Sequence, residues 1–245
     1  MTFSLALLLS FAAQDDKEAE KAATAALDQF QKTFKGADQD RISAIDELAK
    51  VQHPKVATKL GSLLTASLST PVRVAAAKAL GGFSENKKPA AMALAKAIGP
   101  NAKEPNVYNQ IFENIANLHE PSSAPLLAPY YDDKDLLIAQ NAIFTTGKVG
   151  SGAGVDPLIA ALSKNEKIAK PSGSGGGIGV QSNNPGAQGG LVVGGNSNSA
   201  AKERAQALVA AANQALQNIA KEQLAGSDAW SAWWAKNKAN FNAKK

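Results

Sequence analysis

The chain contains no cysteine, which excludes both a disulfide framework and a thiolate metal site. Aromatic residues are scarce at 6% of the sequence, although apolar residues make up 44%. Alanine supplies much of that apolar content, and it combines a small side chain with the highest helix propensity of any residue. The composition therefore favours helices that pack closely against other helices.

No apolar run in the sequence is long enough to cross a bilayer. Residues 1–13 carry no charge, and small residues at Ser10 and Ala12 precede an abruptly charged segment. We interpret residues 1–13 as a signal peptide cleaved near Ala12 or Ala13, which predicts an exported protein, periplasmic or extracellular, with no transmembrane segment after cleavage. No Lys or Arg precedes the apolar run, so an apolar, disordered N-terminus is the alternative.

The charge is nearly balanced, because 26 Lys and Arg residues face 21 Asp and Glu residues for a formal net charge of +5. We interpret this charge as spread along the chain, except for a basic cluster in the last residues. Such a cluster is more often a solvated tail than a binding site.

A helical repeat is the main pattern that the sequence does contain. Residues 41–51 and 73–83 share the template Arg-x-x-Ala-[Ala/Ile]-x-x-Leu-small-x-apolar, and residues 108–118, 139–150 and 209–219 follow it more loosely. Its apolar positions recur at i, i+3, i+4, i+7 and i+10, which is one face of an α-helix. Each copy is therefore predicted to be a helix, here called helix B of its unit.

A second apolar helix, helix A, is predicted ahead of helix B in four units, at residues 56–64, 90–98, 124–131 and 155–162. Each of these segments begins close to a proline, which is tolerated at the first helical position because that N–H has no partner. Three aspartates stand where an N-cap is expected. They are Asp135, Asp156 and Asp228.

Residues 73–81, with Arg73, Ala76, Ala77, Leu80 and Gly81 in the template, resemble a HEAT repeat. The resemblance spans residues 17–220 and about five helix pairs. It implies a right-handed α-solenoid in which the B helices line a concave face, and protein binding as the usual role.

The sequence around the three tryptophans is similar to a terminal cap of exported HEAT-repeat proteins of environmental bacteria such as planctomycetes. The sequence therefore predicts an all-α protein with three regions. These regions are a signal peptide at 1–13, an α-solenoid at 14–226, and a cap with a basic tail at 227–245.

Residues 171–199 lose all periodicity and consist largely of Gly, Ser and Asn. Such a composition buries too little apolar surface to offset the entropy of ordering it. We predict a disordered insertion within the last repeat, with short strands at 178–180 and 191–193 as the alternative. The glycine spacing does not match a nucleotide-binding motif.

Residues with catalytic or metal-binding chemistry are few. The two histidines, His53 and His119, fall in turns and have no third histidine to join them. The acidic run 132–135 is expected on an exposed turn, and no nucleophile stands beside a base. We predict no enzyme activity, no cofactor and no metal site.

Trp230, Trp233 and Trp234 share one helical face. They are predicted to be a structural cap, since the last repeat of a solenoid has an apolar end that must be covered. The alternative is a binding platform for a polysaccharide or an envelope partner.

The predicted function is that of a monomeric, non-catalytic scaffold that binds another protein on the concave B-helix face. Nucleic-acid binding is the alternative, but the B helices lack the Lys/Arg stripe that it needs. The candidate partner-binding residues are polar side chains predicted to face away from the core. They are Lys78, Asn109, Gln110, Glu113, Asn117, Gln140 and Asn141.

Overall fold

A computed structural model describes the backbone of residues 3–170 and 196–241 and the side chains of residues 16–170 and 199–241. Within those ranges every regular element is a helix, which confirms the all-α prediction. None of the helices in the described ranges is long and apolar enough to cross a membrane.

The helices of the described chain form five successive pairs, and the two members of each pair contact each other. The pairs are α1 (Phe3–Thr33) with α2 (Asp38–Ala49), α3 (Pro54–Thr65) with α4 (Thr70–Gly81), α5 (Lys87–Ala97) with α6 (Pro105–Leu118), α7 (Ala124–Leu127) with α8 (Leu136–Val149), and α9 (Val155–Ala169) with α10 (Asn196–Ala220). A last helix, α11 (Ser227–Phe241), follows them.

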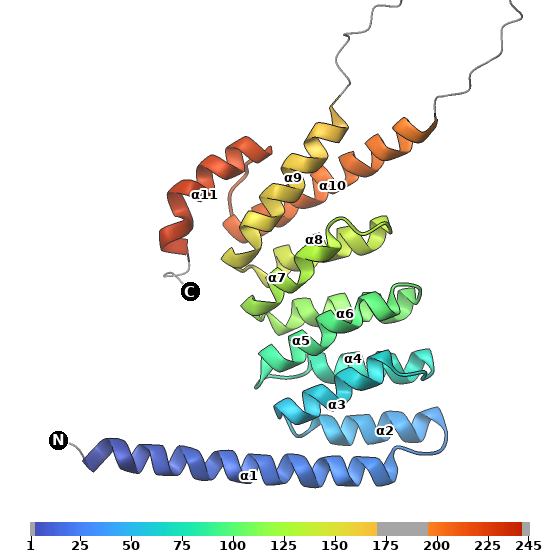
Figure 1. The fold of residues 1–245 in the computed structure, drawn as a ribbon, viewed down its shortest axis with the longest axis vertical. Helices are drawn as coiled ribbons and strands as arrows, with labels where there is room; N and C mark the ends of the chain where they lie inside the picture. Colours follow the sequence, from blue (N-terminus) through green and yellow to red (C-terminus); the bar gives the residue numbers. More distant parts are fainter. Residues whose placement is uncertain (1–2, 171–195, 242–245) are drawn as a thin grey trace, which may run out of the picture.

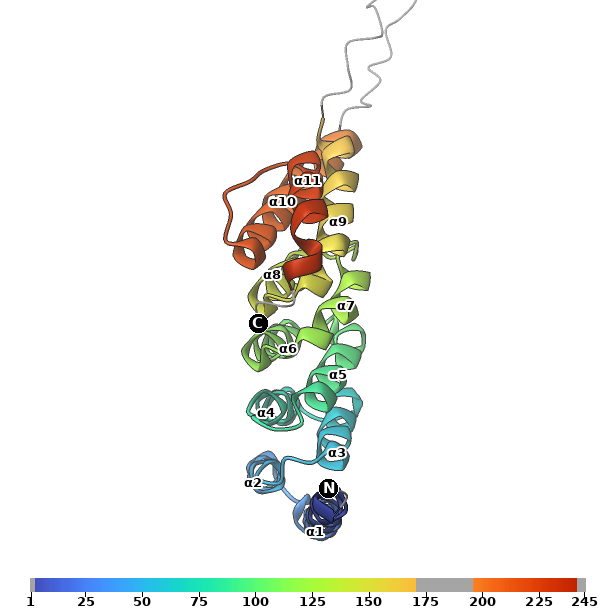
Figure 2. The same cartoon turned by 90° about the vertical axis from the view of Figure 1, so that its left-hand side faces the viewer.

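The pairs stack along the long axis of the molecule (Figure 1). Turned by 90°, the stack separates into two rows (Figure 2). The A row contains α1, α3, α5, α7 and α9, and the B row contains α2, α4, α6, α8 and α10. Successive helices of the B row contact one another, as do α1 with α3, α3 with α5 and α5 with α7 in the A row.

Small residues set how closely neighbouring helices approach. A Cβ added to Gly147 of α8 would lie 2.7 Å from the Cα of Ala215 on α10. In the A row, a Cβ on Gly61 of α3 would lie 2.8 Å from the Cβ of Ala93 on α5. The backbones can come this close only where a side chain is absent, so glycine at these two positions allows the observed spacing of successive helices within each row.

The start of α8 agrees with the sequence prediction. Asp135 is its N-cap and accepts hydrogen bonds from the N–H groups of Leu137 and Ile138 at 2.8 and 3.4 Å. Gly150 ends the helix in the left-handed conformation, with φ at 70°.

The predictions for Asp156 and Asp228 were wrong. Asp156 lies inside the first turn of α9, whose N-cap is Gly154, and Asp228 lies inside the first turn of α11. Ser227, the first residue of α11, donates its N–H and its hydroxyl to the Glu166 carboxylate of α9. The Glu166 side chain, which is distant in sequence, therefore accepts the hydrogen bonds at the start of α11 that were expected to go to Asp228.

Helix A of the fourth unit is shorter than predicted. Residues 124–131 form only the four-residue helix α7 and the 3-10 turn Ala128–Tyr130, and another 3-10 turn precedes them. Pro129 interrupts the backbone bonding of the predicted helix, because proline has no N–H to donate, whereas Pro125 lies in the first turn of α7, where it is tolerated.

Two predicted segments lie partly outside the described residues. The predicted cleavage point near Ala12 falls within the backbone of α1, and the side chains of residues 1–15 are not described, so the signal peptide stays a prediction. Of the predicted insertion, residues 171–195 are not described, whereas 196–199 belong to α10. The chain leaves α9 and enters α10 at the same end of that pair (Figure 1).

Candidate functional site

The polar side chains predicted on helix B of the third unit lie on the outer side of α6. Asn109, Glu113 and Asn117 are exposed and Gln110 is half-buried. The spacing of four residues between the three exposed side chains aligns them along one stripe of the helix. Gln110 donates a hydrogen bond to the Glu113 carboxylate at 2.9 Å, which holds both side chains against the helix.

One hydrogen bond joins this stripe to the neighbouring helix. The Asn141 side chain on α8 donates to the Asn109 side-chain oxygen at 2.9 Å. Gln140, also on α8, is half-buried, and Lys78 on α4 is exposed. The structure therefore brings Asn109 and Asn141 together, whereas no bond links Gln140 or Lys78 to them among the described residues. We call these seven residues the amide face. It comprises Lys78, Asn109, Gln110, Glu113, Asn117, Gln140 and Asn141.

A buried amide supports the amide face from below, and sequence reasoning missed it. Asn114 of α6 donates to the backbone oxygen of Gln110 at 2.7 Å. A Cβ on Gly81 of α4 would lie 1.9 Å from the Asn114 side-chain oxygen. The small residue in the repeat template was the available signal, because it leaves room for a polar side chain of the next repeat.

The arginine of the repeat template belongs to a polar cluster that the sequence did not reveal. Arg73 donates to the Asn101 side-chain oxygen at 2.7 Å and lies 3.3 Å from the Glu104 carboxylate. Asn101 is fully buried and donates to the backbone oxygens of Leu64 and Ala97 at 2.9 and 2.8 Å. The cluster joins α3, α4 and α5 and has a structural role.

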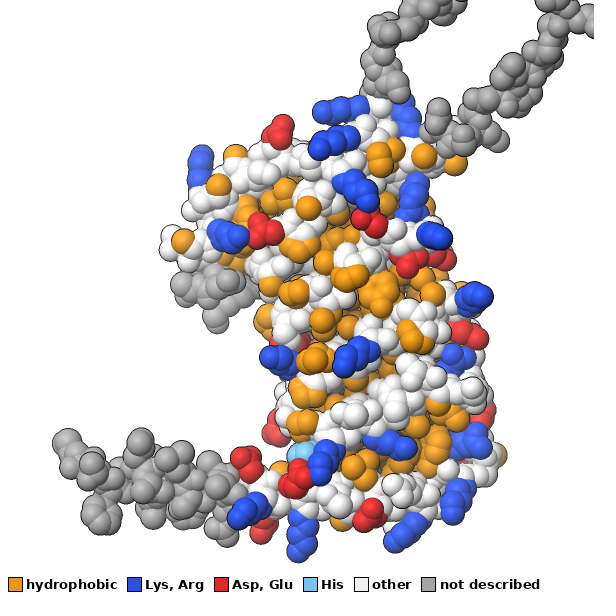
Figure 3. All heavy atoms as spheres, in the orientation of Figure 1, with side chains coloured by type: hydrophobic (Ala, Val, Ile, Leu, Met, Phe, Trp, Pro, Cys, Tyr) orange, Lys and Arg blue, Asp and Glu red, His pale blue; other side chains and the backbone are white. Residues whose placement is uncertain are grey.

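A cleft of about 790 Å³ opens where α6, α8 and α10 end, beneath α11. Asn117 of the amide face lies on its wall, together with amides from α10 and α11, two lysines and two aromatic rings. The view with atoms as spheres shows α11 overhanging this edge of the stack (Figure 3). The wall residues with polar or aromatic side chains are Asn117, His119, Lys148, Asn218, Lys221, Glu222, Trp233, Asn237, Asn240 and Phe241.

The three tryptophans of α11 are not equally accessible. Trp230 is fully buried and Trp234 is 5% exposed, whereas Trp233 is half-buried and lines the cleft. The indole N–H of Trp230 donates to Asn213 of α10, and that of Trp234 donates to Asp156 of α9, at 3.0 and 2.8 Å. Both buried indole N–H groups therefore have partners in neighbouring helices.

The histidines lie in turns, as the sequence indicated. His53 is the N-cap of α3 and its Nδ1 accepts from the Lys55 N–H at 3.2 Å. His119 ends α6 in the left-handed conformation. Among the described residues no three His, Asp or Glu side chains are grouped so that they could hold a metal ion.

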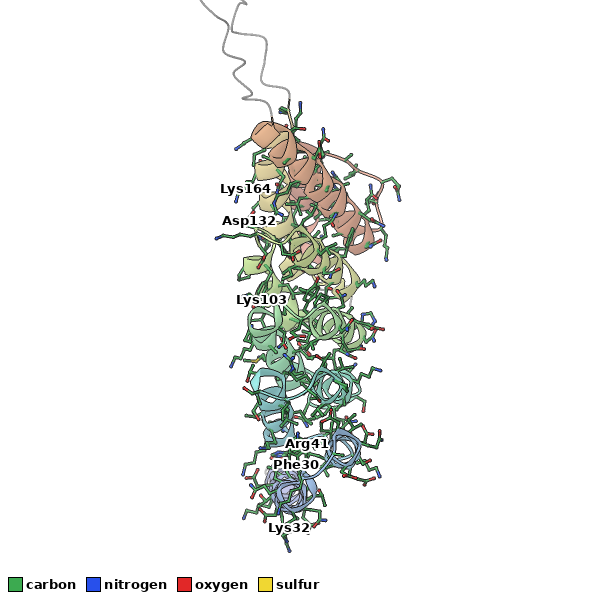
Figure 4. The ribbon with its side chains drawn as sticks, turned by 90° about the vertical axis from the view of Figure 1, so that its right-hand side faces the viewer. Phe30, Lys32, Arg41, Lys103, Asp132 and Lys164 are labelled. Carbon is green, nitrogen blue, oxygen red and sulfur yellow. The ribbon has the colours of Figure 1, made fainter. Side chains whose placement is uncertain are left out.

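The side chains of the acidic run 132–135 form structural contacts, two of them local and one with α9. Asp132 pairs with Lys164 of α9 at 2.8 Å, and both are labelled together at the edge of the stack in Figure 4. Asp133 accepts from the Asp135 N–H at 2.9 Å, and Asp135 caps α8. Burial raises the pKa of the neighbouring Tyr131, whose hydroxyl donates to Thr146 at 2.7 Å. These groups therefore fix the α7–α8 turn.

Comparison with known protein families and with characterised proteins found no match to this chain.

Proposed function

We propose that this chain is a non-catalytic interaction scaffold, built as an α-solenoid of HEAT type, that binds a partner protein through the amide face of the B row. The Asn141–Asn109 bond is the observation that carries this proposal, because it joins the polar stripes of two adjacent helices. A side-chain amide both donates and accepts, so this surface suits the backbone of a protein segment.

The charge of the amide face favours a protein partner over a nucleic-acid partner. It holds a single basic residue, Lys78, and one acidic residue, Glu113. Nucleic acid requires several Lys or Arg side chains along the phosphates, since counterion release supplies most of the affinity. A neutral surface recognises its partner by hydrogen bonding and shape instead.

The burial of Trp230 and Trp234 favours a structural role for the end of the chain. Both rings lie in the apolar core, so their faces are not available to stack on a sugar. We further propose that the chain is exported, on the strength of its apolar N-terminal residues.

The test compares two double variants with the same change in charge. Asn109→Arg with Asn117→Arg alters the amide face, and Ala232→Arg with Ala239→Arg alters exposed positions of α11. Each full chain is used to capture proteins from the envelope fraction of the source cells, which are then quantified by mass spectrometry. We expect the amide-face variant alone to lose a partner that the parent captures. Recovery of the same proteins by all three chains would refute the proposal.

A further inference from the structure

The positive charge of the chain is concentrated between the start of α3 and the turn before α6, contrary to the even distribution inferred from the sequence. Residues 54–103 contain eight Lys or Arg residues and a single acidic residue, Glu85, for a net charge of +7. The whole chain has a net charge of only +5. The basic residues are Lys55, Lys59, Arg73, Lys78, Lys87, Lys88, Lys96 and Lys103.

Most of these residues belong to the A row, on the side of the molecule opposite the amide face. Neither α3 nor α5 contains an acidic residue. Figure 3 faces this row and shows Lys and Arg side chains around apolar ones over these helices. Figure 4 labels Lys103 on the same row, where α5 gives way to α6.

Partners within the fold neutralise only some of the lysines. Lys55 pairs with Glu20 of α1, and the ammonium of Lys59 lies 5.5 Å from the centre of the Phe30 ring. Lys87, Lys88, Lys96 and Lys103 form no ion pair with any described residue. Lys164 of α9, by contrast, is paired with Asp132 at 2.8 Å. Helix α5 therefore carries three lysines, Lys87, Lys88 and Lys96, that no described acidic side chain pairs with.

A groove of about 480 Å³ runs between α3 and α5 at the same place. Its floor contains Gly61, Ala93 and Pro89, and Met92 is exposed beside them. Lys88 and Lys96 stand along one side of the groove. These two lysines are eight residues apart on one helix, which places their Cα atoms about 12 Å apart, with Met92 midway between them.

We propose that this groove, the A-row groove, binds an acidic segment of a partner protein. An apolar side chain of that segment lies against Met92 and Ala93, and carboxylates on either side of it pair with Lys88 and Lys96. Methionine side chains adapt their shape to different apolar ligands. Flanking opposite charges determine orientation and accelerate association.

The lining of the groove favours a protein segment over other anions. It contains no aromatic ring on which a nucleic-acid base could stack and no arginine to grip a phosphate in two places. Binding to a lipid surface requires an extended apolar face, whereas Met92 is the one large apolar side chain that the lining exposes.

The experiment selects peptides from a displayed random library by their binding to the full-length parent chain. The Kd of each selected peptide is then measured for the parent and for the groove variant, Lys88→Glu with Lys96→Glu. The control variant, Lys167→Glu with Lys236→Glu, makes the same change in net charge at exposed positions of α9 and α11. We expect the selected peptides to be acidic with at least one large apolar residue. Their Kd should rise about tenfold in the groove variant, as for a close interfacial charge pair, and stay unchanged in the control.

Other outcomes would overturn the proposal. One is a failure of the selection to enrich acidic peptides, and another is an equal loss of peptide affinity in the groove variant and the control variant. A third is that binding of oligothymidine or of phosphatidylserine vesicles depends more strongly on Lys88 and Lys96 than the binding of any peptide does. The Asn109→Arg with Asn117→Arg variant should bind the peptides like the parent. The A-row groove and the amide face therefore succeed or fail separately.

Discussion

The middle of the stack and its C-terminal end are held together by different kinds of contact. In the middle, α3 to α6 pack through small residues, and one buried polar cluster around Asn101 joins α3, α4 and α5. At the end, α11 packs mainly on α9 and is fastened by aromatic rings and by acceptor side chains. Those acceptors are Asp156 and Glu166 of α9 and Asn213 of α10.

The difference follows from how many neighbours a helix pair has. A pair in the middle is covered on both sides by pairs like itself, so one repeated template can specify all of its contacts. The last pair has a neighbour on one side only, and what covers its other side must be different. The repeat can therefore be recognised from its template, whereas the fastening of α11 requires contacts that occur once.

The largest loss of stability is expected when an aromatic ring that fastens α11 is removed. Trp230→Ala should lower the free energy of unfolding by about 3–5 kcal/mol, because it leaves a cavity in the core and removes the bond to Asn213. Denaturant unfolding followed by circular dichroism measures the change. Trp233→Ala is the control and should cost clearly less, since that ring is half-buried. Equal stability of the Trp230→Ala chain and the parent would mean that α11 does not cap the stack.

The second prediction tests the polar cluster in the middle. Asn101→Ala should lower the free energy of unfolding by about 2–4 kcal/mol, because more than one buried group loses its partner. Those groups are the Arg73 guanidinium and the backbone oxygens of Leu64 and Ala97. The same denaturant experiment with Asn106→Ala, an exposed position, should show almost no change. A small change in the free energy of unfolding for Asn101→Ala would show that packing through small residues stabilises the middle of the stack without the polar cluster.

A third prediction concerns the close approach of α8 and α10. Gly147→Ala adds a Cβ 2.7 Å from the Cα of Ala215, and the backbone must shift to admit it. The net loss should be about 1–2 kcal/mol, because the gain in helix propensity offsets part of the packing cost. Thermal unfolding should show a lower Tm. Gly82→Ala is the matched control, since its nearest neighbouring atom lies 3.6 Å away, and it should unfold like the parent.

The smallest effect is expected at the junction of α1 with α3. The Lys55 ammonium, bonded to Glu20, holds the pKa of that carboxyl below its ordinary value of 4.5. The contact therefore stabilises the fold fully above pH 4.5, and its contribution is lost as the pH falls through the lowered pKa. The Tm of Glu20→Gln should lie slightly below that of the parent at neutral pH, and the two should converge in acid. A difference that grows in acid would contradict this assignment.

The helices could be predicted from the sequence because their apolar spacing is local. Residues 73–83 and 108–118 contain enough of the template to place α4 and α6 within a few residues. The outward positions of Asn109, Glu113 and Asn117 followed from the same periodicity.

The tertiary hydrogen bonds could not be predicted in this way. Asp156 has the sequence of an N-cap, yet it accepts hydrogen bonds from Trp234 and Lys238, about eighty residues later. Asn101 stands in a short turn and gives no sign that Leu64 and Arg73 meet there. Such pairings depend on which helices stack, and a single sequence does not encode that in any short pattern. The A-row groove could not be predicted for a related reason, because the lysines of α5 border a groove only once α3 and α5 stack.

The junction between α9 and α10 offers a place to engineer this protein. The two helices pack along each other, and the chain leaves one and enters the other at the same end of the pair. A fluorescent protein inserted between Lys170 and Asn196, in place of the intervening residues, would leave the described contacts of α9 with α10 in place, since Lys170 is exposed and exposed sites tolerate domain insertion. The resulting chain would report where the protein resides in living cells while both termini stay unmodified.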